Sequence, residues 1–533
     1  MSITPFSLSL SLLTLAATSL VHAAEETPER WASDGKAAIQ AALDRRPIEK
    51  QARNVILFVG DGMGISTVTA SRIYEGQRRG ETGEENWLSF ETLPYTALAK
   101  TYNVDLQTPD SAGTMSAMVT GIKTNAGVLS VNQYSVRGDA DSVAGNEVVT
   151  LLEKAEIAGK ATGIVTTARV THATPGACYA HSSNRNWECD ANMPEGAPIS
   201  DIAAQLIEMP ARMQAAGFAQ VDGPELVWGG GRRFFFPEGE IDAQYSVEGD
   251  SGRRKDGRNL VQEWIDTREG GSYIHNLDTF ESIDVNADSK ILGLFESSHM
   301  QFEADREKDA GGEPSLAEMT RKAIALLERD EDGYFLMVEG GRIDHAHHAG
   351  NAYRALADTV ALSDAVRVAR EATSEEDTLI IVTADHSHVF TMAGYPARGN
   401  NILGLVANAD GKLAEDAMDL PYTTLGYQNG PGYLGASDAQ PEGPKVFPHS
   451  PTGAKGIREG RHDLSEHLHG ELEDGCDAFF SHLQESAYPM SSETHGGEDV
   501  GVWASGPYAH LLGGTIEQHV LFHLMEFAFG FSE

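Results

Sequence analysis

The chain has 533 residues, of which 79 are acidic and 40 basic, so its net charge is −39. This length suits one large domain or two to three average ones, and the 41% hydrophobic content excludes global disorder and a multispanning membrane protein. So acidic a surface repels polyanions, which argues against nucleic-acid binding. The charge indicates a solvating acidic surface of the kind that suits a halophilic, salt-rich medium.

The N-terminus has the features of a targeting segment. Residues 8–21 are apolar, and Val21-His22-Ala23 is a small-x-small cleavage signal, although no Lys or Arg precedes the apolar run. We therefore expect residues 1–23 to be a signal peptide, residues 24–533 to be the mature domain, and the protein to be periplasmic or secreted. No other run is long and apolar enough to span a bilayer, so we expect no transmembrane anchor in the mature chain.

Short apolar runs alternate with amphipathic segments along the chain. In chain order, the pattern predicts a strand at residues 54–59, a helix at 112–120, strands at 163–166, 226–228 and 334–338, a helix at 352–370, strands at 378–383 and 500–504, and a closing helix at 516–529. Such alternation predicts an α/β fold with a doubly wound, mostly parallel central sheet that is flanked by helices on both faces.

One segment departs from this alternation. Residues 395–488 are rich in Gly, Pro, Asn and Asp and lack sustained apolar periodicity, which predicts an inserted, loop-rich region. This region either covers the active site, forms a subunit contact, or is a tolerated surface excursion.

The three cysteines are Cys178, Cys189 and Cys476, too few to form a disulfide scaffold for a chain of this length. In an exported protein, a local bridge between Cys178 and Cys189 is one option, and it would leave Cys476 single. The stability of the fold must therefore come from its hydrophobic core.

Metal-ligand residues stand directly after the predicted strands. Asp61, Glu339, Asp385 and His386 each follow an apolar run. In an open parallel sheet the carboxyl ends of the strands share one edge, where ligands bind, so these distant residues are expected to converge. A single acid after a strand is usually a turn or cap residue, but four such positions rich in Asp, Glu and His favour a metal site.

The segment after Glu339 reads EGGRIDHAHH. Asp344 and His348 are four residues apart, which places both on one face of a helical turn. Asp with His suits zinc, whereas Asp, Glu and hydroxyl oxygens suit magnesium. The alternative is a surface histidine cluster. His495, just before the last predicted strand, is placed to complete a site.

The candidate nucleophile is Ser111 in TPDSAGTMSAMVTG. It opens a predicted helix, near the positive end of the helix dipole and free amides, which suits an anionic substrate. The alternative is a simple N-cap serine. A metal that lowers the serine pKa makes a Ser-His-Asp arrangement unnecessary. The lack of a G-x-S-x-G motif argues against an α/β-hydrolase.

Six motifs stand in order along the chain: FVGDGMG, PDSAGT, THATPGACYAHSSNRNW, VEGGRIDHAHH, VTADHSH and ETHGGEDV. With them the chain, from about Asn54 to the C-terminus, resembles the alkaline phosphatase family, and several motifs are closer to the animal pattern than to the best-known bacterial one. The resemblance implies that one zinc is held by Asp344, His348 and His495, and a second by Asp61, Asp385 and His386 beside Ser111. It also implies a magnesium held by Asp61, Thr174 and Glu339, and Arg185 gripping two phosphate oxygens.

The sequence departs from the best-known bacterial pattern at two positions. His172 stands where that form has Asp, and His345 where it has Lys, and both match the animal pattern. These histidines are expected to tune the magnesium site and the surroundings of the phosphate. The animal enzymes also carry a fourth, calcium-like site, and Glu296 and Glu313 stand where its ligands are expected.

The resemblance implies hydrolysis of small-molecule phosphate monoesters through a phosphoserine intermediate by a homodimer with two zinc ions and one magnesium ion per site. One alternative is a phosphodiesterase or sulfatase of the same superfamily, although PDSAGT is not the C/S-x-P-x-R motif of sulfatases. A second is a non-catalytic periplasmic metal or phosphate binder, which needs no nucleophile. A third is a structural secreted protein with salt-binding acidic clusters.

Overall fold

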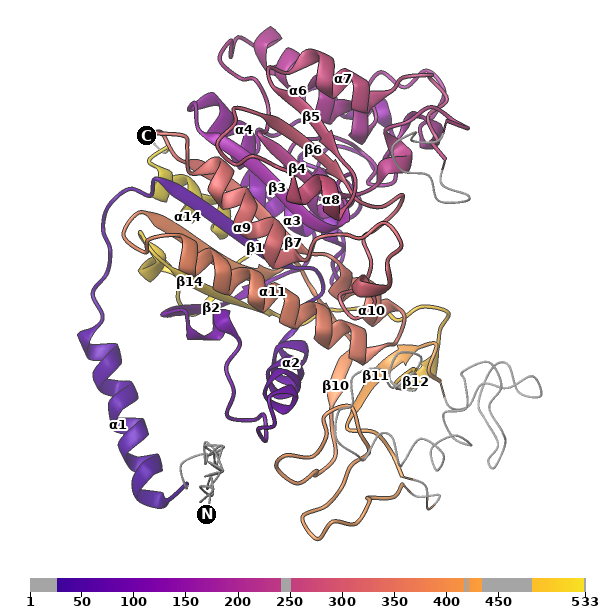
Figure 1. Ribbon diagram of the computed structural model, residues 1–533. Coiled ribbons are helices and arrows are strands. Elements are labelled where there is room, and N and C mark those ends of the chain that lie inside the picture. Colours follow the sequence, from indigo (N-terminus) through magenta and orange to yellow (C-terminus); the bar gives the residue numbers. More distant parts are fainter. Residues whose placement is uncertain (1–25, 241–250, 417–418, 420, 434–481, 532–533) are drawn as a thin grey trace, which may run out of the picture. The chain divides into compact units, whose positions relative to one another are not determined.

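The computed structural model describes residues 26–240, 251–416, 419, 421–433 and 482–531 (Figure 1). The chain divides into two compact units, Met1–Pro47 and Ile48–Glu533. In the first unit, helix α1 (Pro28–Asp44) begins where the Thr27 hydroxyl accepts a hydrogen bond from a backbone N–H. The expected signal peptide, residues 1–23, lies outside the described residues.

A ten-stranded sheet runs through the described part of the second unit (Figure 1). Its strands are β1 (Asn54–Gly60), β2 (Tyr95–Lys100), β3 (Ala161–Arg169), β4 (Leu226–Gly230), β5 (Gly271–Ile274), β6 (Lys290–Leu294), β7 (Tyr334–Gly340), β8 (Thr378–Ala384), β14 (Val500–Ser505) and β15 (Thr515–Glu517). They lie in the order β15-β2-β14-β8-β1-β7-β3-β4-β6-β5. Only β14 is antiparallel to its neighbours, β2 and β8.

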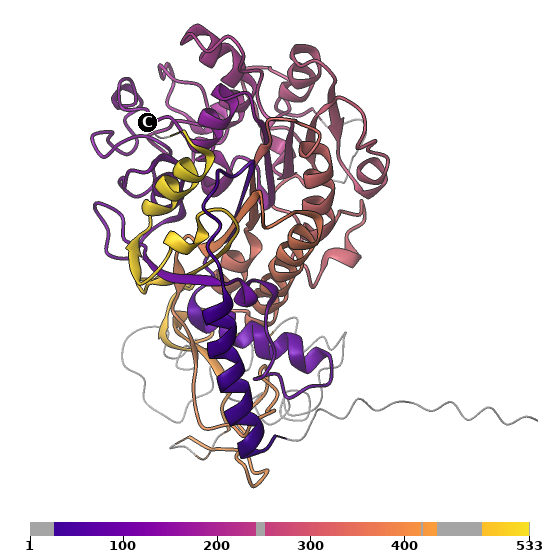
Figure 2. The same ribbon diagram turned by 90° about the vertical axis from the view of Figure 1, so that its left-hand side faces the viewer.

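Helices cover both faces of this sheet. On one face α2 (Ile65–Arg78) and α9 (Leu316–Leu327) pack against α11 (Ala352–Ala372). The other face carries α3 (Ser111–Thr120), α4 (Leu151–Ile157), α5 (Ala173–Gly176) and α14 (Val520–Phe529). Figure 2 shows α11 in orange and α14 in yellow on opposite sides of the strands. Further helices of the described residues are α6 (Ile202–Ala215), α7 (Leu260–Thr267), α8 (Leu277–Glu281) and α10 (Arg342–His348).

The three central strands explain why the fold was predictable. Every residue of β1, β7 and β8 is buried, as expected for parallel strands that are covered on both faces. The doubly wound α/β fold predicted from the alternating pattern is therefore confirmed. The predicted closing helix begins too early, because Thr515–Glu517 pairs in parallel with the edge strand β2 and α14 starts only at Val520.

Two small sheets lie outside the central one. The first pairs β9 (Ser387–His388) with β13 (His495–Gly496). The second joins β10 (Phe390–Met392), β11 (Leu425–Gly430) and β12 (Glu485–Pro489). β11 and most of β12 belong to the predicted inserted region, residues 395–488, of which 434–481 and a few other residues lie outside the described part.

The local disulfide bridge considered from the sequence does not form. Cys178 and Cys189 are both free and buried. The Cys178 thiol points to the Thr174 carbonyl at 3.9 Å, and the Cys189 thiol donates to the Asn192 side chain at 3.2 Å. Cys476 lies outside the described residues.

A buried carboxyl group on α4 makes the stability of the fold depend on pH. Glu156 accepts hydrogen bonds from the Thr162 hydroxyl at 2.6 Å and from the Gly223 N–H at 3.1 Å. Burial, reinforced by the Glu225 carboxylate, raises the pKa of Glu156 to about 8 from 4.5. The Glu156 carboxyl group loses its proton at a lower pH in the unfolded chain than in the folded one. Its contribution to the stability of the folded state is therefore present below about pH 4.5 and is lost as the pH rises toward 8.

We therefore expect Glu156→Gln to raise Tm by a few degrees at pH 9, with a difference from wild type that shrinks toward pH 5. The amide keeps one acceptor for Gly223 and donates to the Thr162 hydroxyl. Thermal unfolding of both proteins between pH 5 and 9 measures the effect. An equal Tm difference at every pH would contradict it.

Candidate active site

The parallel register brings the predicted strand-end residues together. Gly60 of β1 lies opposite Gly340 of β7 and Ala384 of β8. Asp61 and Asp385 directly follow their strands, so both lie at the same edge of the sheet. Glu339, one residue before Gly340, lies opposite Thr166 of β3, whose hydroxyl donates to its carboxylate. These side chains are fully buried.

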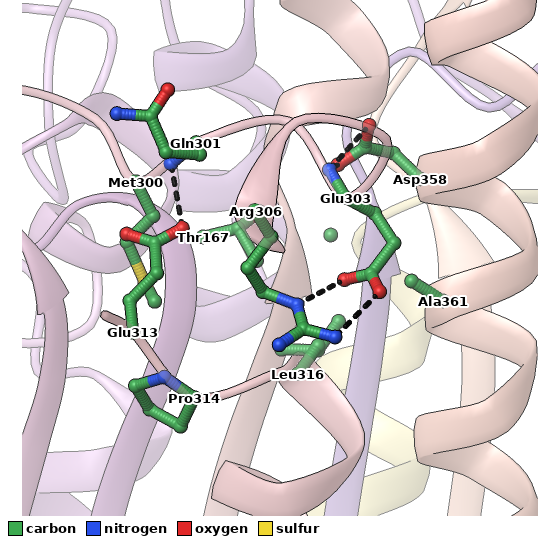
Figure 3. Close-up of a pocket in the computed structure, with 11 residues that line it drawn as sticks. Thr167, Met300, Gln301, Glu303, Arg306, Glu313, Pro314, Leu316, Asp358 and Ala361 are labelled. Carbon is green, nitrogen blue, oxygen red and sulfur yellow. Dashed lines mark hydrogen bonds and ion pairs between the residues drawn. The ribbon is translucent and has the colours of Figure 1, made fainter. Parts of the chain in front are cut away.

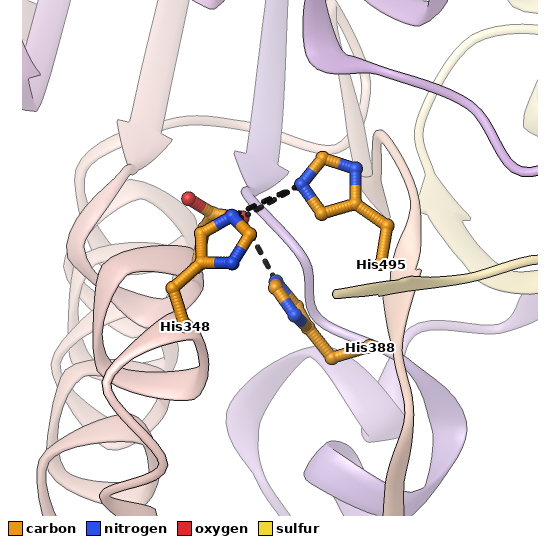
Figure 4. Close-up of side chains that lie close together, drawn as sticks. His348, His388 and His495 are labelled. Carbon is orange, nitrogen blue, oxygen red and sulfur yellow. Dashed lines mark hydrogen bonds and ion pairs between the residues drawn. The ribbon is translucent and has the colours of Figure 1, made fainter. Parts of the chain in front are cut away.

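A first cluster contains the predicted residues Asp344, His348 and His495, together with His388 (Figure 4). The Asp344 Oδ1 atom lies 3.3 Å from His348 Nε2 and 3.4 Å from His495 Nε2, and the two histidine nitrogens are 3.1 Å apart. Asp344 and His348 share one face of α10, as their spacing predicted. None of the side chains around them on α10 is exposed, so the surface-cluster alternative is wrong.

His388 was missed from the sequence, although it is the second histidine of VTADHSH. It donates from Nε2 to Asp344 at 2.8 Å, and its Nδ1 lies 2.5 Å from Glu493 Oε2. Burial by itself lowers the pKa of His388, but the Glu493 and Asp344 carboxylates outweigh it and raise the pKa to about 10. His388 therefore orients the Asp344 carboxylate.

A second cluster joins Asp61, Asp385 and His386. His386 Nε2 lies 3.4 Å from Asp61 Oδ1 and 3.4 Å from Asp385 Oδ2. The same nitrogen lies 3.1 Å from the Ser111 hydroxyl oxygen. The structure thus places the candidate nucleophile directly at this cluster, beside the residues predicted to hold a second zinc.

A third cluster joins Asp61 to Glu339 and His172. Thr174, fully buried on α5, lies beside the Glu339 carboxylate. Asp61 therefore belongs to both the second and the third cluster, as a bridging ligand must. His172 was predicted only to tune this site, but one of its ring nitrogens lies within 4.8 Å of an oxygen of each of the two carboxylates.

The donor sets of these clusters fit divalent cations. Both carboxylate oxygens of Asp61, one oxygen each of Glu339 and Asp385, and Nδ1 of His172 are buried without a hydrogen-bond partner. Burial, followed by neighbouring carboxylates, raises the pKa of Asp61 well above its ordinary value. Burial also raises the pKa of Glu339 to about 8. Buried carboxylate oxygens without a partner are costly unless cations pair with them, so the residues fit the metals that the motifs imply.

Ser111 is the first residue of α3. Asp110 is the N-cap and accepts from the Gly113 N–H at 3.2 Å, so the alternative of an N-cap serine is wrong. The other Asp110 oxygen accepts from Arg185 Nη1 at 3.1 Å, and Arg185 Nη2 lies 3.0 Å from His172 Nε2. Asp110, which the sequence reasoning missed, thus joins the nucleophile helix to the predicted phosphate-binding arginine.

His172, the partner of this arginine, belongs to a group of three histidine rings. His345 packs against His299 with ring centroids 4.0 Å apart, and His172 lies 5.6 Å from His345. Burial lowers the pKa of His345 to about 3, so its imidazole is neutral. His345 is therefore a packing partner of His172, and His299 is an addition that no sequence motif signalled.

The two residues expected at a fourth site also come together. Glu296 and Glu313 form a cluster with Asp309, which the sequence reasoning missed. Gln301 donates its backbone N–H to Glu313 at 2.8 Å and its side chain to Glu296 at 3.1 Å. Figure 3 shows Gln301 and Glu313 at the wall of a cavity of about 10 Å³. One oxygen each of Asp309 and Glu313 is buried and unpartnered.

In one further acidic cluster, an arginine side chain neutralises the carboxylates. Asp190, Asp201 and Asp256 surround Arg254, which is 1% exposed. Its guanidinium donates to both Asp201 oxygens at 3.0 and 2.8 Å and to Asp256 at 2.5 Å. Because the arginine already neutralises these carboxylates, the cluster is a structural ion-pair network.

The sequence model of the alkaline phosphatase family matches residues 52–531. The chain is 41% identical to the tissue-nonspecific alkaline phosphatase isozyme of Gallus gallus over 529 residues, 97% of this chain and 92% of that protein. It is also 41% identical to an alkaline phosphatase of Gadus morhua over 511 residues, 95% and 97% of the two chains.

Solved structures agree on the fold. The alkaline phosphatase of Thermus thermophilus has a TM-score of 0.61 at 24% identity, covering 92% of this chain and 94% of that one. The enzyme of the Antarctic bacterium TAB5 has a TM-score of 0.56 at 21% identity, covering 91% and 100%. Given the family match and relatives that are similar over almost their whole length, the chain belongs to the alkaline phosphatase family.

Proposed function

We propose that this protein hydrolyses phosphate monoesters to an alcohol and inorganic phosphate through a phosphoserine intermediate. The observation that carries the proposal is the position of the Ser111 hydroxyl. It lies at the N-terminus of α3, 3.1 Å from His386 and next to buried carboxylates with unpartnered oxygens. A nucleophile, a cation site and an anion-binding helix end therefore meet at one point.

The donor atoms suggest which metal each cluster holds. Asp344, His348 and His495 would hold one zinc, Asp61, Asp385 and His386 a second, and Asp61, Thr174 and Glu339 a magnesium. Carboxylate with imidazole suits zinc, whereas carboxylate with hydroxyl oxygen suits magnesium. When bound, such cations neutralise charge on the attacking and leaving oxygens of a phosphoryl transfer. The oxygen-only cluster of Glu296, Asp309 and Glu313 suits a fourth divalent cation.

Three residues of the chain have separate roles in this proposed reaction. The Ser111 oxygen loses its proton to solvent and attacks phosphorus in line. The bond from phosphorus to the leaving alkoxide breaks, and the alkoxide takes a proton from water to become the alcohol. Arg185 donates two hydrogen bonds to phosphoryl oxygens, a geometry that lysine cannot reproduce. Asp110 orients Arg185 by its 3.1 Å contact with Nη1. Water then attacks the phosphoserine, which releases phosphate and regenerates the Ser111 hydroxyl.

A panel of three ester types tests this proposal. The purified protein, loaded with zinc and magnesium, is assayed on matched chromogenic phosphate monoester, phosphate diester and sulfate ester substrates. We expect turnover of the monoester that requires the metals and exceeds the other two by orders of magnitude. Preference for the diester or the sulfate would favour those members of the superfamily, and metal binding without any turnover would favour a binding protein.

Further properties belong to the same proposal. The predicted signal peptide supports an exported protein, periplasmic or secreted. Among the described residues, no helix is long and apolar enough to cross a membrane. The family supports a homodimer, and the net charge of −39 supports function in a salt-rich medium. Small-molecule phosphate monoesters are the expected substrates.

His172 should set the metal preference of the third site. Its buried Nδ1 has no hydrogen-bond partner, and the residue belongs to one candidate ligand cluster with Asp61 and Glu339. We expect His172→Asp to bind magnesium at least about tenfold more tightly, because a carboxylate replaces nitrogen by oxygen. Magnesium titration of the zinc-loaded protein, followed by activity and by Tm, measures this. Unchanged half-saturation would show that His172 does not face the third site.

A further inference from the structure

Strand β11, which belongs to the inserted region 395–488, lies against the first metal cluster. Its Gln428 N–H donates to the Val389 carbonyl at 2.9 Å, directly after β9, the strand that carries His388. The Val389 N–H in turn donates to the Thr494 carbonyl at 3.3 Å, next to His495. Backbone hydrogen bonds therefore join β11 to the residue after β9, and join that residue to the one before β13.

Asn429 of β11 holds the segment that carries His495. Its side-chain amide donates from Nδ2 to the Thr494 hydroxyl at 2.9 Å. The Thr494 N–H donates back to Asn429 Oδ1 at 3.1 Å. This two-point contact fixes both the side chain and the backbone of the residue that precedes His495.

Tyr427 of β11 holds the segment that carries His348. Its hydroxyl lies 2.8 Å from His347 Nδ1, and the other nitrogen of His347 lies 3.0 Å from the Thr67 hydroxyl of α2. Tyr427 is 4% exposed, and His347 is fully buried. The His347 ring packs 4.9 Å from the ring of His388, which binds Asp344. The tyrosine thus orients the residue that precedes His348.

Tyr427 and Asn429 are two residues apart on one strand, so both side chains point to the same face. Gln428, between them, points the other way and is exposed. One face of β11 therefore contacts both α10, which carries His348, and the residue directly before His495. The Nε2 atoms of these two histidines lie 3.1 Å apart. Partners that orient metal ligands in this way commonly change metal affinity by 10–100-fold when they are removed.

We propose that Tyr427 and Asn429 are positioning residues through which the inserted region holds His348 and His495 in the geometry of the first zinc site. The inference rests on the metal assignment of the proposed function. It gives the described part of the inserted region a role that neither a subunit contact nor a tolerated surface excursion supplies. Both residues act through their neighbours and contact neither the metal nor the substrate.

The test uses the full-length protein and three substitutions on β11. Tyr427→Phe removes one oxygen, Asn429→Ala removes both contacts to Thr494, and Gln428→Ala is the matched control on the opposite face. Each metal-free protein is titrated with zinc in competition with a chromophoric chelator. We expect the first two variants to bind one zinc per chain about 10–100-fold more weakly, with the other zinc unchanged, and the control to match wild type.

Two measurements separate positioning from a general loss of structure. The visible spectrum of the cobalt-substituted protein should shift for Tyr427→Phe, and the Tm of its metal-free form should stay near that of wild type. Asn429→Asp keeps the acceptor for the Thr494 N–H, so it should restore much of the zinc affinity. If Asn429→Ala fails to fold, Tyr427→Phe alone decides the question.

Zinc affinities of Tyr427→Phe and Asn429→Ala equal to that of Gln428→Ala would overturn the inference and leave the proposed function intact. A wild-type protein that binds no zinc, or that binds zinc without hydrolysing monoesters, would overturn the proposed function instead. Because affinity is measured without substrate, the two failures are distinguishable.

Discussion

Ser111→Ala should lower kcat for phosphate monoesters by at least about 10³-fold, because it removes the only atom that forms the covalent intermediate. The fold should persist, because α3 is capped by Asp110 and not by the serine. Zinc binding should also persist, since the ligands of both zinc clusters remain. Steady-state hydrolysis of a chromogenic monoester, together with acid trapping of the phosphorylated protein, measures the effect.

The control for this experiment is Thr108→Ala, which removes an exposed hydroxyl three residues before Ser111. It should leave turnover and the trapped phosphoprotein near wild-type values. Retained phosphoserine signal or near-normal kcat in Ser111→Ala would show that another group attacks phosphorus.

Asp61→Asn should have opposite effects on the metal-free and metal-loaded proteins. In the metal-free protein, burial and then the neighbouring carboxylates raise the pKa of Asp61, so loss of its ionisable group should raise Tm by a few degrees. In the presence of zinc and magnesium the variant should lose most of the metal-induced rise in Tm. Its kcat should fall by about 10³-fold or more, because Asp61 belongs to two clusters.

Thermal unfolding with and without metals, combined with metal analysis, measures these changes. Glu331→Gln serves as the control, since it neutralises an exposed acid before β7. It should change neither the Tm of the metal-free protein nor that of the metal-loaded protein. A lower metal-free Tm for Asp61→Asn would contradict the view that these carboxylates repel one another in the absence of cations.

The convergence of the candidate site residues was predictable because their signals are local in the sequence. Buried strands such as β1 and β8 are continuous apolar runs, and the acids that follow them are visible as the first polar residues after the run. The register of parallel strands then determines that Asp61 and Asp385 meet. The spacing of Asp344 and His348 on α10 required only the period of a helix.

The residues that sequence reasoning missed act at longer range. His388, Asp110 and Asp309 are polar residues in loops or at element ends, where many acids and histidines are only turn or cap residues. Their roles depend on partners far away in the chain, as for Asp110 with Arg185, which is 75 residues distant. The start of the closing helix was misplaced for the same reason, since pairing with β2 decided that Thr515–Glu517 is a strand.

The sequence by itself determined the α/β class and the central strands, and it predicted the candidate nucleophile and the candidate metal ligands, because periodicity and ligand chemistry are properties of short segments. Only the tertiary structure decided that Asp110 orients Arg185, that His388 orients Asp344, and that Tyr427 and Asn429 of the inserted region contact the segments of two ligands. Those contacts are set by how loops and strands far apart in the chain pack together, and no local pattern encodes that packing.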